Sequence, residues 1–308
     1  MGRSYVIITP AKNEEIYLPF LAESMLKQTI QPTAWFIIDD GSDDGTPRII
    51  DDLASKHPWI HGKRLEKGQT ANIQEQDNHF VRLIKEAFDY VVDYYAGEGI
   101  EYEYIGQVDA DMLLPPDYFE KVIEGFEQNP KLGIAGGHYT FVKLGEKGNI
   151  IQRKTPPCIA DDNPSGGCML IKRACFQDIG GIPIAPGQDG ATLAKARLCG
   201  WKTRRLIDIE MFHLRERGSA RWEGYIVYCL DAHPLLVLLN CLDSFFVKRA
   251  PLRALGYLYG YSLSFLKREQ KVTDPSLRYY FRHKRLGEVR KIISLKMKSK
   301  FNNLKPRK

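Results

Sequence analysis

The fold is decided by residues 35–46, which read WFIIDDGSDDGT. Residues 35–40 form a short, β-rich apolar run that ends in two carboxylates, and the glycine-containing sequence after it predicts a turn. A similar run over residues 4–9 ends in polar residues, and a helical pattern over residues 14–28 lies between the two runs. Two strands joined by a helix predict a βαβ unit of an α/β sheet.

The alternation of strands and helices continues beyond this unit. A helix is expected from Thr46, which would be its N-cap. Apolar residues at three- and four-residue spacing predict an amphipathic helix over residues 80–95. Residues 104–108 then form a strand that ends directly in Asp109-Ala-Asp111. Because open α/β sheets bind ligands at the carboxyl ends of their strands, these carboxylates predict a binding site.

Length and composition bound the class of protein. The 308 residues fit one large or two modest domains, and we expect an α/β domain over residues 1–224 and a helical extension over residues 225–308. With 44% hydrophobic and 27% charged residues, the chain is neither collagen-like, low-complexity nor mostly disordered. Its six cysteines include no CxxC pair, and no signal peptide is recognised, so we expect reduced thiols in the cytoplasm.

The basic charge is concentrated near the C-terminus. Residues 267–308 carry 15 Lys and Arg against 3 Asp and Glu, whereas the whole chain has a net charge of +6. The apolar stretch 225–247 is not expected to span a membrane, because Asp231, His233 and Asp243 interrupt it. Amphipathic segments before a basic tail favour contact with an anionic membrane surface, at roughly 1 kcal/mol per nearby basic residue. Packing of these segments on the α/β domain is the alternative.

The pair Asp109 and Asp111 flanks a single residue, so a bend there can direct both carboxylates to one divalent cation. Mg²⁺ or Mn²⁺ would bridge the phosphates of a diphosphate and neutralise the charge that develops on a nucleotide leaving group. The alternative for an isolated pair of this kind is a solvated turn whose aspartates cap a helix.

Six segments in this order resemble a family 2 glycosyltransferase of the GT-A fold. They are TPAKNE (9–14), IIDDGSDDGT (37–46), VDADM (108–112), GGCMLIKR (166–173), GQD (187–189) and HLR (213–215). The resemblance covers most of the chain. It implies a Rossmann-like mixed sheet flanked by helices, with a C-terminal helical extension. It also implies inverting, metal-dependent transfer of a sugar from a nucleotide-sugar donor to a hydroxyl of a glycan or lipid-linked saccharide.

The resemblance assigns donor binding to the ends of the first strands and to the acidic pair. The residues assigned are Pro10, Glu14, Asp39, Asp40 and Asp109. A carboxylate can accept hydrogen bonds from ribose hydroxyls or from a pyrimidine N–H. A UDP-sugar is the expected donor because the family often prefers uridine, and GDP- and dTDP-sugars remain open. Lys12 either touches a phosphate or is a solvated surface residue.

The same resemblance assigns the metal and the base. Asp109, Asp111 and His213 would hold Mn²⁺ or Mg²⁺, and a purely structural histidine is the alternative for His213. Asp189 inherits the role of general base, with Gln188 in place of the family's usual glutamate. An inverting transfer needs one carboxylate within hydrogen-bond reach of the acceptor hydroxyl. A role of Asp189 as helix N-cap is compatible with this function.

Processive synthesis is disfavoured. Arg221-Trp222 stands where processive synthases of the family carry QxxRW, but the residue three before Arg221 is Gly218. Arg215 and Arg217 either meet phosphate or acceptor or lie in solvent. The C-terminal part resembles, more loosely, soluble members that act on envelope or exopolysaccharide precursors. This resemblance implies a cytoplasmic enzyme, peripheral at the inner face of the cell membrane.

Other classes of function give different readings of the same features. A non-catalytic scaffold at a membrane surface would retain the fold, but the retained acidic residues argue against it. A nucleic-acid binder would act through the basic tail, where Tyr279, Tyr280 and Phe281 lie between arginines. A sugar nucleotidyltransferase would carry a glycine-rich, arginine-containing loop after the first strand, where this chain has TPAKNE.

Overall fold

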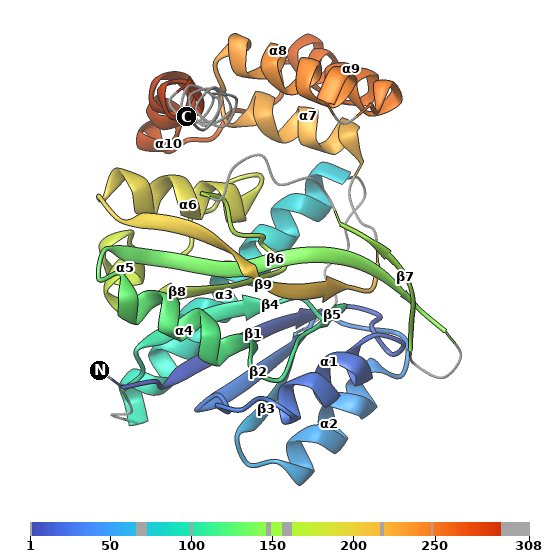
Figure 1. The fold of residues 1–308 in the computed structure, drawn as a ribbon, viewed down its shortest axis with the longest axis vertical. Helices are drawn as coiled ribbons and strands as arrows, with labels where there is room; N and C mark the ends of the chain where they lie inside the picture. Colours follow the sequence, from blue (N-terminus) through green and yellow to red (C-terminus); the bar gives the residue numbers. More distant parts are fainter. Residues whose placement is uncertain are drawn as a thin grey trace, which may run out of the picture. The chain divides into compact units, whose positions relative to one another are not determined.

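The computed structural model describes residues 2–65, 73–98, 101–145, 149–155, 162–215, 219–247 and 249–290 (Figure 1). The chain divides into two compact units, Met1–Glu216 and Arg217–Lys308. The first unit contains the sheet, and the described part of the second is helical. The domain boundary expected at residue 224 falls inside the first helix of the second unit, α7 (Ala220–Cys229).

The first unit is built on a mixed sheet of nine strands within the described residues, in the order β3-β2-β1-β4-β8-β6-β9-β5, with β7 on β6. The strands β1, β2, β3 and β4 run parallel, whereas β8 is antiparallel to both β4 and β6. Their bounds are β1 Tyr5–Ala11, β2 Ala34–Asp39, β3 Ile60–Arg64, β4 Tyr104–Val108, β5 Met112–Leu113, β6 Leu132–Leu144, β7 Ile150–Lys154, β8 Cys168–Lys172 and β9 Lys202–His213. The expected α/β fold with a mixed sheet is confirmed.

Helices cover both faces of this sheet (Figure 1). They are α1 (Leu18–Leu26), α2 (Thr46–Lys56), α3 (Ile73–Glu98), α4 (Tyr118–Gln128), α5 (Arg173–Asp178) and α6 (Gln188–Leu198). Alternate residues of β1 point to opposite faces, so Tyr5 and Ile7 pack with α1, α2 and α4, whereas Val6 and Ile8 pack with α3, α5 and α6. Burial on both faces explains the continuous apolar run of this strand.

Two helix starts differ from the sequence prediction. The N-cap of α2 is Gly45 rather than Thr46, whose hydroxyl accepts a hydrogen bond from the Glu14 N–H at 2.7 Å. The N-cap of α6 is Gly187, which has a positive φ of 64°, and Asp189 lies in the first turn of that helix. The N-cap predictions for Thr46 and Asp189 are therefore wrong: α2 already includes Thr46, and the left-handed turn at Gly187 starts α6 two residues before Asp189.

The second unit contains α7, α8 (Pro234–Leu242), the π-helix η1 (Asp243–Val247), α9 (Pro251–Lys267), α10 (Pro275–Tyr279) and the π-helix η2 (Tyr280–Lys284). Its small core includes Val237 and Cys241 of α8 packed with Tyr257 of α9. No helix in the described part of the chain combines the length and the hydropathy that a bilayer crossing needs.

Helices α7 and α9 cross at two glycines that let their backbones touch. A Cβ atom on Gly260 would lie 1.9 Å from the carbonyl oxygen of Arg221. A Cβ atom on Gly224 would lie 2.1 Å from the carbonyl oxygen of Tyr257. Backbone atoms cannot rotate away as a side chain can, so this crossing requires glycine on both helices.

We expect Gly260→Ala to destabilise the second unit by about 2 kcal/mol or more, because overpacking outweighs the gain of about 1 kcal/mol in helix propensity. Urea unfolding followed by circular dichroism measures the change. Gly287→Ala is the matched control in the same unit, since a Cβ atom there meets nothing within 4 Å. A Gly260→Ala variant as stable as Gly287→Ala would show that the helices do not cross at this glycine.

Candidate functional site

Strand ends bring the predicted metal ligands together. The chain leaves β4 at Asp109, whose N–H donates to the carbonyl oxygen of Gly167 at 2.8 Å. The two-residue strand β5 then places Met112 opposite His213, the last residue of β9. As a result, ligand atoms of Asp109, Asp111 and His213 all lie within 4.8 Å of one another. The structure therefore brings together all three of the residues that were assigned to the metal.

The residues of this cluster fit a divalent cation. The side chain of Asp111 is fully buried, and Nδ1 of His213 lies 3.7 Å from its Oδ1. That Nδ1 atom is buried and has no hydrogen-bond partner in the described part of the structure. Two carboxylates and one imidazole suit Mn²⁺ better than Mg²⁺, which prefers oxygen ligands alone. The identity of the metal is left open between the two.

Burial shifts the titration of several groups here. Burial and the nearby Asp111 carboxylate raise the pKa of Asp109 to about 7, although Gln107 donates a hydrogen bond of 2.9 Å to this carboxylate. Burial lowers the pKa of His213, which favours the neutral imidazole that binds metals. A concentration of carboxylates in a buried place is unfavourable by itself, and a bound cation would relieve it.

The guanidinium of Arg215 supplies positive charge next to the carboxylates of this cluster. Its Nε donates to Oδ2 of Asp111 at 3.0 Å, and its terminal nitrogen pairs with Glu14. The guanidinium also lies over the ring of Tyr17, 4.7 Å from the ring centroid. Sequence reasoning offered phosphate, acceptor or solvent for Arg215, and the structure shows carboxylates instead. Arg217, its companion in that prediction, lies outside the described residues.

Arg215 also explains where Glu14 lies. Glu14 is almost fully buried at the end of the loop after β1, and burial raises its pKa while Arg215 opposes that rise. The assigned donor residue Glu14 is thereby connected to the acidic cluster through one guanidinium. A pair of carboxylates that share an arginine forms only in three dimensions, so the sequence carried no signal for it.

The other residues assigned to the donor lie at the ends of β1 and β2. Pro10 of β1 pairs with Ile38 of β2, next to Asp39. Oδ1 of Asp39 accepts the Ser42 N–H at 3.0 Å, which shapes the turn after β2. The structure thus gathers these residues at the carboxyl edge of the sheet, two strands from Asp109 in the order β2-β1-β4.

Asp40 has two nitrogen-bearing neighbours, Lys12 and His79. Lys12 donates to its Oδ2 at 2.9 Å, and Nε2 of His79 lies 2.7 Å from its Oδ1. Lys12 therefore contacts a carboxylate, a role that the sequence prediction did not consider. His79 matched no motif, and it reaches Asp40 from α3, which is distant in sequence.

Asp189 lies in the first turn of α6, and its Oδ1 accepts the N–H of Gly190 at 2.8 Å. Burial raises the pKa of this carboxyl group. Gly166 and Gly167 separate it from the metal cluster. A Cβ atom on Gly166 would lie 2.6 Å from Oδ2 of Asp189, and one on Gly167 would lie 2.9 Å from Nε2 of His213. The glycine pair therefore lies directly between the assigned base and the assigned metal ligand.

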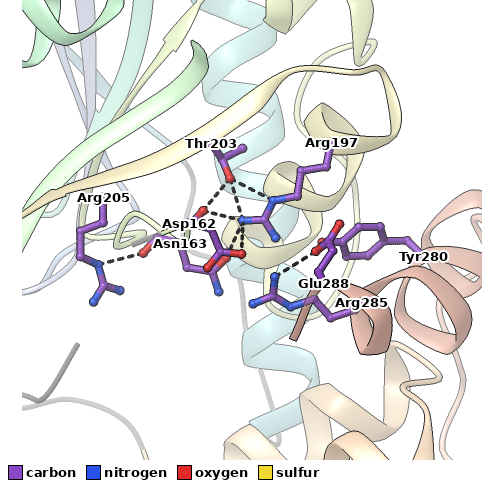
Figure 2. A network of polar contacts seen from close by, with 8 residues as sticks. All are labelled: Asp162, Asn163, Arg197, Thr203, Arg205, Tyr280, Arg285 and Glu288. Carbon is purple, nitrogen blue, oxygen red and sulfur yellow. Dashed lines mark hydrogen bonds and ion pairs between the residues drawn. The ribbon is translucent and has the colours of Figure 1, made fainter. Parts of the chain in front are cut away.

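A network around Arg197 holds this part of the first unit (Figure 2). Arg197 extends from α6 and donates to the carbonyl oxygen of Asp162 at 2.5 Å and to Oδ1 of Asn163 at 2.6 Å. It also donates to Thr203 of β9 at 2.7 Å, and Arg205 donates to the carbonyl oxygen of Asn163 at 2.9 Å. Arginine thus fixes the segment that leads to Gly166 against the helix that carries Asp189.

Figure 2 also shows a smaller network that belongs to the second unit. Glu288 accepts hydrogen bonds from the hydroxyl of Tyr280 at 2.7 Å and from Arg285 at 3.0 Å. The side chain of Tyr280 is buried, and Glu288 gives its hydroxyl group the hydrogen-bond partner that a buried tyrosine needs.

Comparisons with known sequences find similarity over part of the chain. Residues 6–76 match the model of Glycosyl transferase family 2. The chain is 32% identical over 145 residues to the chondroitin synthase of Escherichia coli, a match that covers 47% of the chain and 18% of the relative. It is 28% identical over 157 residues to the poly-beta-1,6-N-acetyl-D-glucosamine synthase of Staphylococcus epidermidis, with 47% and 33% covered. The chain spans a third or less of the length of these curated relatives.

Solved structures share the fold. A mannosyltransferase from Pyrobaculum calidifontis, in complex with GDP-Man and Mn²⁺, superposes with a TM-score of 0.51 at 16% identity over 88% of this chain and 76% of its own. Residues 1–349 of S. aureus TarS, in complex with UDP-GlcNAc, give 0.50 at 15% identity over 87% and 76%. These likenesses confirm the expected GT-A fold, and at such identity they concern the fold alone.

Proposed function

We propose, starting from the match of residues 6–76 to the model of Glycosyl transferase family 2, that the chain transfers a sugar from a nucleotide-sugar donor to a hydroxyl group of a saccharide. The transfer is metal-dependent and inverts the configuration at the sugar. One observation carries the proposal. The cluster of Asp109, Asp111 and His213 lies next to the carboxylate of Asp189, across the pair Gly166-Gly167.

Asp109, Asp111 and His213 would hold Mn²⁺ or Mg²⁺. A bound cation supplies positive charge to the diphosphate of the donor and stabilises the nucleotide as it leaves. The crystallised mannosyltransferase with GDP-Man and Mn²⁺ supports a cation at a donor site of this fold. Arg215 provides a fixed positive charge beside the same carboxylates.

The ends of β1 and β2 bind the nucleotide. Asp39 offers a buried carboxylate to ribose hydroxyls or to a base N–H, and Pro10 and Glu14 line the same edge. The TarS complex with UDP-GlcNAc supports a UDP-sugar, which is our proposal, whereas the mannosyltransferase complex shows GDP-Man with the same fold. Asp40 joins this site if Lys12 and His79 release it, since both contact its carboxylate.

Asp189 is the general base. Its carboxylate accepts the proton of the acceptor hydroxyl as that oxygen attacks the anomeric carbon, opposite the departing nucleotide diphosphate. The first turn of α6 holds it rigidly through the Gly190 N–H. Because burial raises its pKa, this carboxylate binds a proton more readily than an exposed aspartate. The absence of side chains on the glycine pair lets the carboxylate of Asp189 and the imidazole of His213 approach the same backbone segment closely.

The acceptor is a glycan or a lipid-linked saccharide. The curated relatives are named as synthases of chondroitin and of poly-beta-1,6-N-acetyl-D-glucosamine, which supports a saccharide acceptor. We propose non-processive transfer because the QxxRW pattern fails at Gly218, a position outside the described residues. We also propose that the enzyme works in the cytoplasm, peripheral to the inner face of the cell membrane.

A thermal-shift screen tests the donor site. The full chain is melted with UDP, GDP, dTDP or CMP, each with Mn²⁺, Mg²⁺ or EDTA. We expect UDP with metal to raise the melting temperature, because ligand at about 100 times its Kd stabilises the native state by about 2.7 kcal/mol. If GDP with metal raised the melting temperature and UDP did not, the donor would be a GDP-sugar rather than a UDP-sugar. A nucleotide shift of equal size in EDTA would contradict the metal, and the absence of any shift would contradict the proposed function.

A further inference from the structure

Helix α9 in the second unit presents a row of large apolar side chains to solvent. Leu252, Leu255, Tyr259 and Leu266 recur at the spacing of one helix face, and their exposed fractions are 82%, 61%, 57% and 76%. Phe265 beside them is 63% exposed. A face of this size without cover is rare on a soluble monomer and marks a surface that meets a partner. We call these five residues the α9 stripe.

The packing of α9 determines that this face points outward. The opposite side of the helix contains Ala254, Tyr257, Gly260 and Ser264, all buried. Gly260 fixes the rotation of α9, because it is the point at which the backbone of α7 approaches most closely. The three leucines of the α9 stripe lie outside the described core of the second unit. The ring of Phe265 keeps one edge contact with Tyr228, and the guanidinium of Arg221 lies 5.4 Å from the ring centroid of Tyr259.

A second apolar row continues the surface on the neighbouring helix. Leu238, Leu242, Phe245 and Phe246 are exposed along α8 and η1, and Leu238, Leu242 and Phe245 follow one another at spacings of four and three residues. Helix α8 packs against α9 through Val237, Cys241 and Tyr257. Figure 1 shows α8 and α9 on the same side of α7. Two adjacent helices of the second unit thus each expose an apolar row.

The charge of the segment indicates the chemistry of the partner. Residues 243–269 contain five Lys and Arg against two acidic residues, Asp243 and Glu269, which stand at the two ends of the segment. Arg249 precedes α9, and Lys267 and Arg268 end it, all three exposed. Basic residues at the ends of an apolar helix face are typical of helices that lie in the interface of an anionic bilayer. A second copy of this chain fits less well, because an isologous pair would bring like charges together.

We propose that the α9 stripe and the neighbouring row on α8 and η1 form a docking surface for an anionic lipid bilayer. The helices lie in the plane of the interface, with the leucine and phenylalanine side chains below the headgroups and the basic residues at their level. This surface consists of described residues and includes none of residues 291–308. It also does not depend on the chemistry at Asp189, so each idea can fail without the other.

Vesicle binding tests the surface. The full chain is sedimented with vesicles of phosphatidylcholine containing 30% phosphatidylglycerol. The stripe variant replaces Leu252, Leu255 and Leu266 with Ser. The control variant replaces Ile151 and Ile207 of the first unit, which are 64% and 56% exposed, with Ser. We expect the stripe variant to lose about tenfold or more in partition coefficient and the control to stay within about twofold.

Vesicles of pure phosphatidylcholine measure how much the anionic lipid contributes to binding. We expect the wild-type chain to bind them at least about tenfold more weakly than vesicles with phosphatidylglycerol. A chain that ends at Arg290 separates the surface from the tail. Deletion from Lys267 is unsuitable because it removes the buried residues Val272, Leu277 and Tyr280. The truncated chain should show the same loss in the stripe variant.

Circular dichroism and the melting temperature establish that each variant is folded. Four results would overturn the proposal. One is a folded stripe variant that binds vesicles like the control, and another is a wild-type chain that does not bind. The third is binding that depends on residues 291–308 alone. The last is a wild-type dimer in sedimentation velocity that the stripe variant abolishes, since the second copy would then be the partner.

Discussion

Asp189→Asn should lower the rate of sugar transfer by about 10²- to 10⁴-fold and leave donor affinity within about twofold, because only the proton acceptor is removed. Asn keeps the shape of the side chain and a carbonyl oxygen that can still accept the Gly190 N–H. The metal cluster on the far side of Gly166 and Gly167 is unchanged. Steady-state transfer assays and calorimetric titration of the donor in Mn²⁺ measure the two quantities separately.

Asp208→Asn is the matched control, since Asp208 is an exposed carboxylate on β9 of the same unit. It should leave both quantities near the wild-type values. Transfer at the wild-type rate by Asp189→Asn would show that another group is the base. An equal loss of donor affinity and of rate would instead make Asp189 part of the donor site.

The sequence predicted those parts of the site that depend on neighbouring residues along the chain, namely the apolar strands and the polar residues that follow them. The apolar runs of β1, β2 and β4 are buried on both faces, and each ends where polar residues begin. Parallel strands leave their carboxyl ends at one edge, so Asp39 at the end of β2 and Asp109 after β4 lie at the same edge of the sheet. The GT-A fold follows from these strands together with the resemblance of the motifs.

The parts that the sequence did not predict depend on contacts between distant residues. Strand β5 has only two residues, too few for any periodicity, yet its pairing with β9 places His213 beside Asp111. Nothing in the sequence around Arg215 indicates its partners, because Glu14 and Asp111 are about 200 and 100 positions away along the chain. The role of Gly166 and Gly167 is equally non-local, because it arises from side chains of α6 and β9.

Asp111→Asn should weaken metal-dependent donor binding by about 10²-fold or more and should also change the stability of the metal-free protein. Asp111 is completely buried and is one of the three proposed ligands, so the neutral amide removes a negative charge from the site and offers a weaker oxygen ligand. Without metal, Arg215 loses one of its two carboxylates, and breaking a partly buried pair of this kind costs about 1–3 kcal/mol.

Three measurements separate these effects of Asp111→Asn. Titration of Mn²⁺ followed by electron paramagnetic resonance gives the metal affinity, donor calorimetry with and without EDTA gives the coupling, and urea unfolding in EDTA gives the stability. Asp117→Asn is the matched control, because its carboxylate pairs with Lys121 on the surface and should be worth at most about 0.5 kcal/mol. If Asp111→Asn kept wild-type Mn²⁺ affinity, Asp111 would not be a metal ligand, and its burial beside Arg215 would be structural alone.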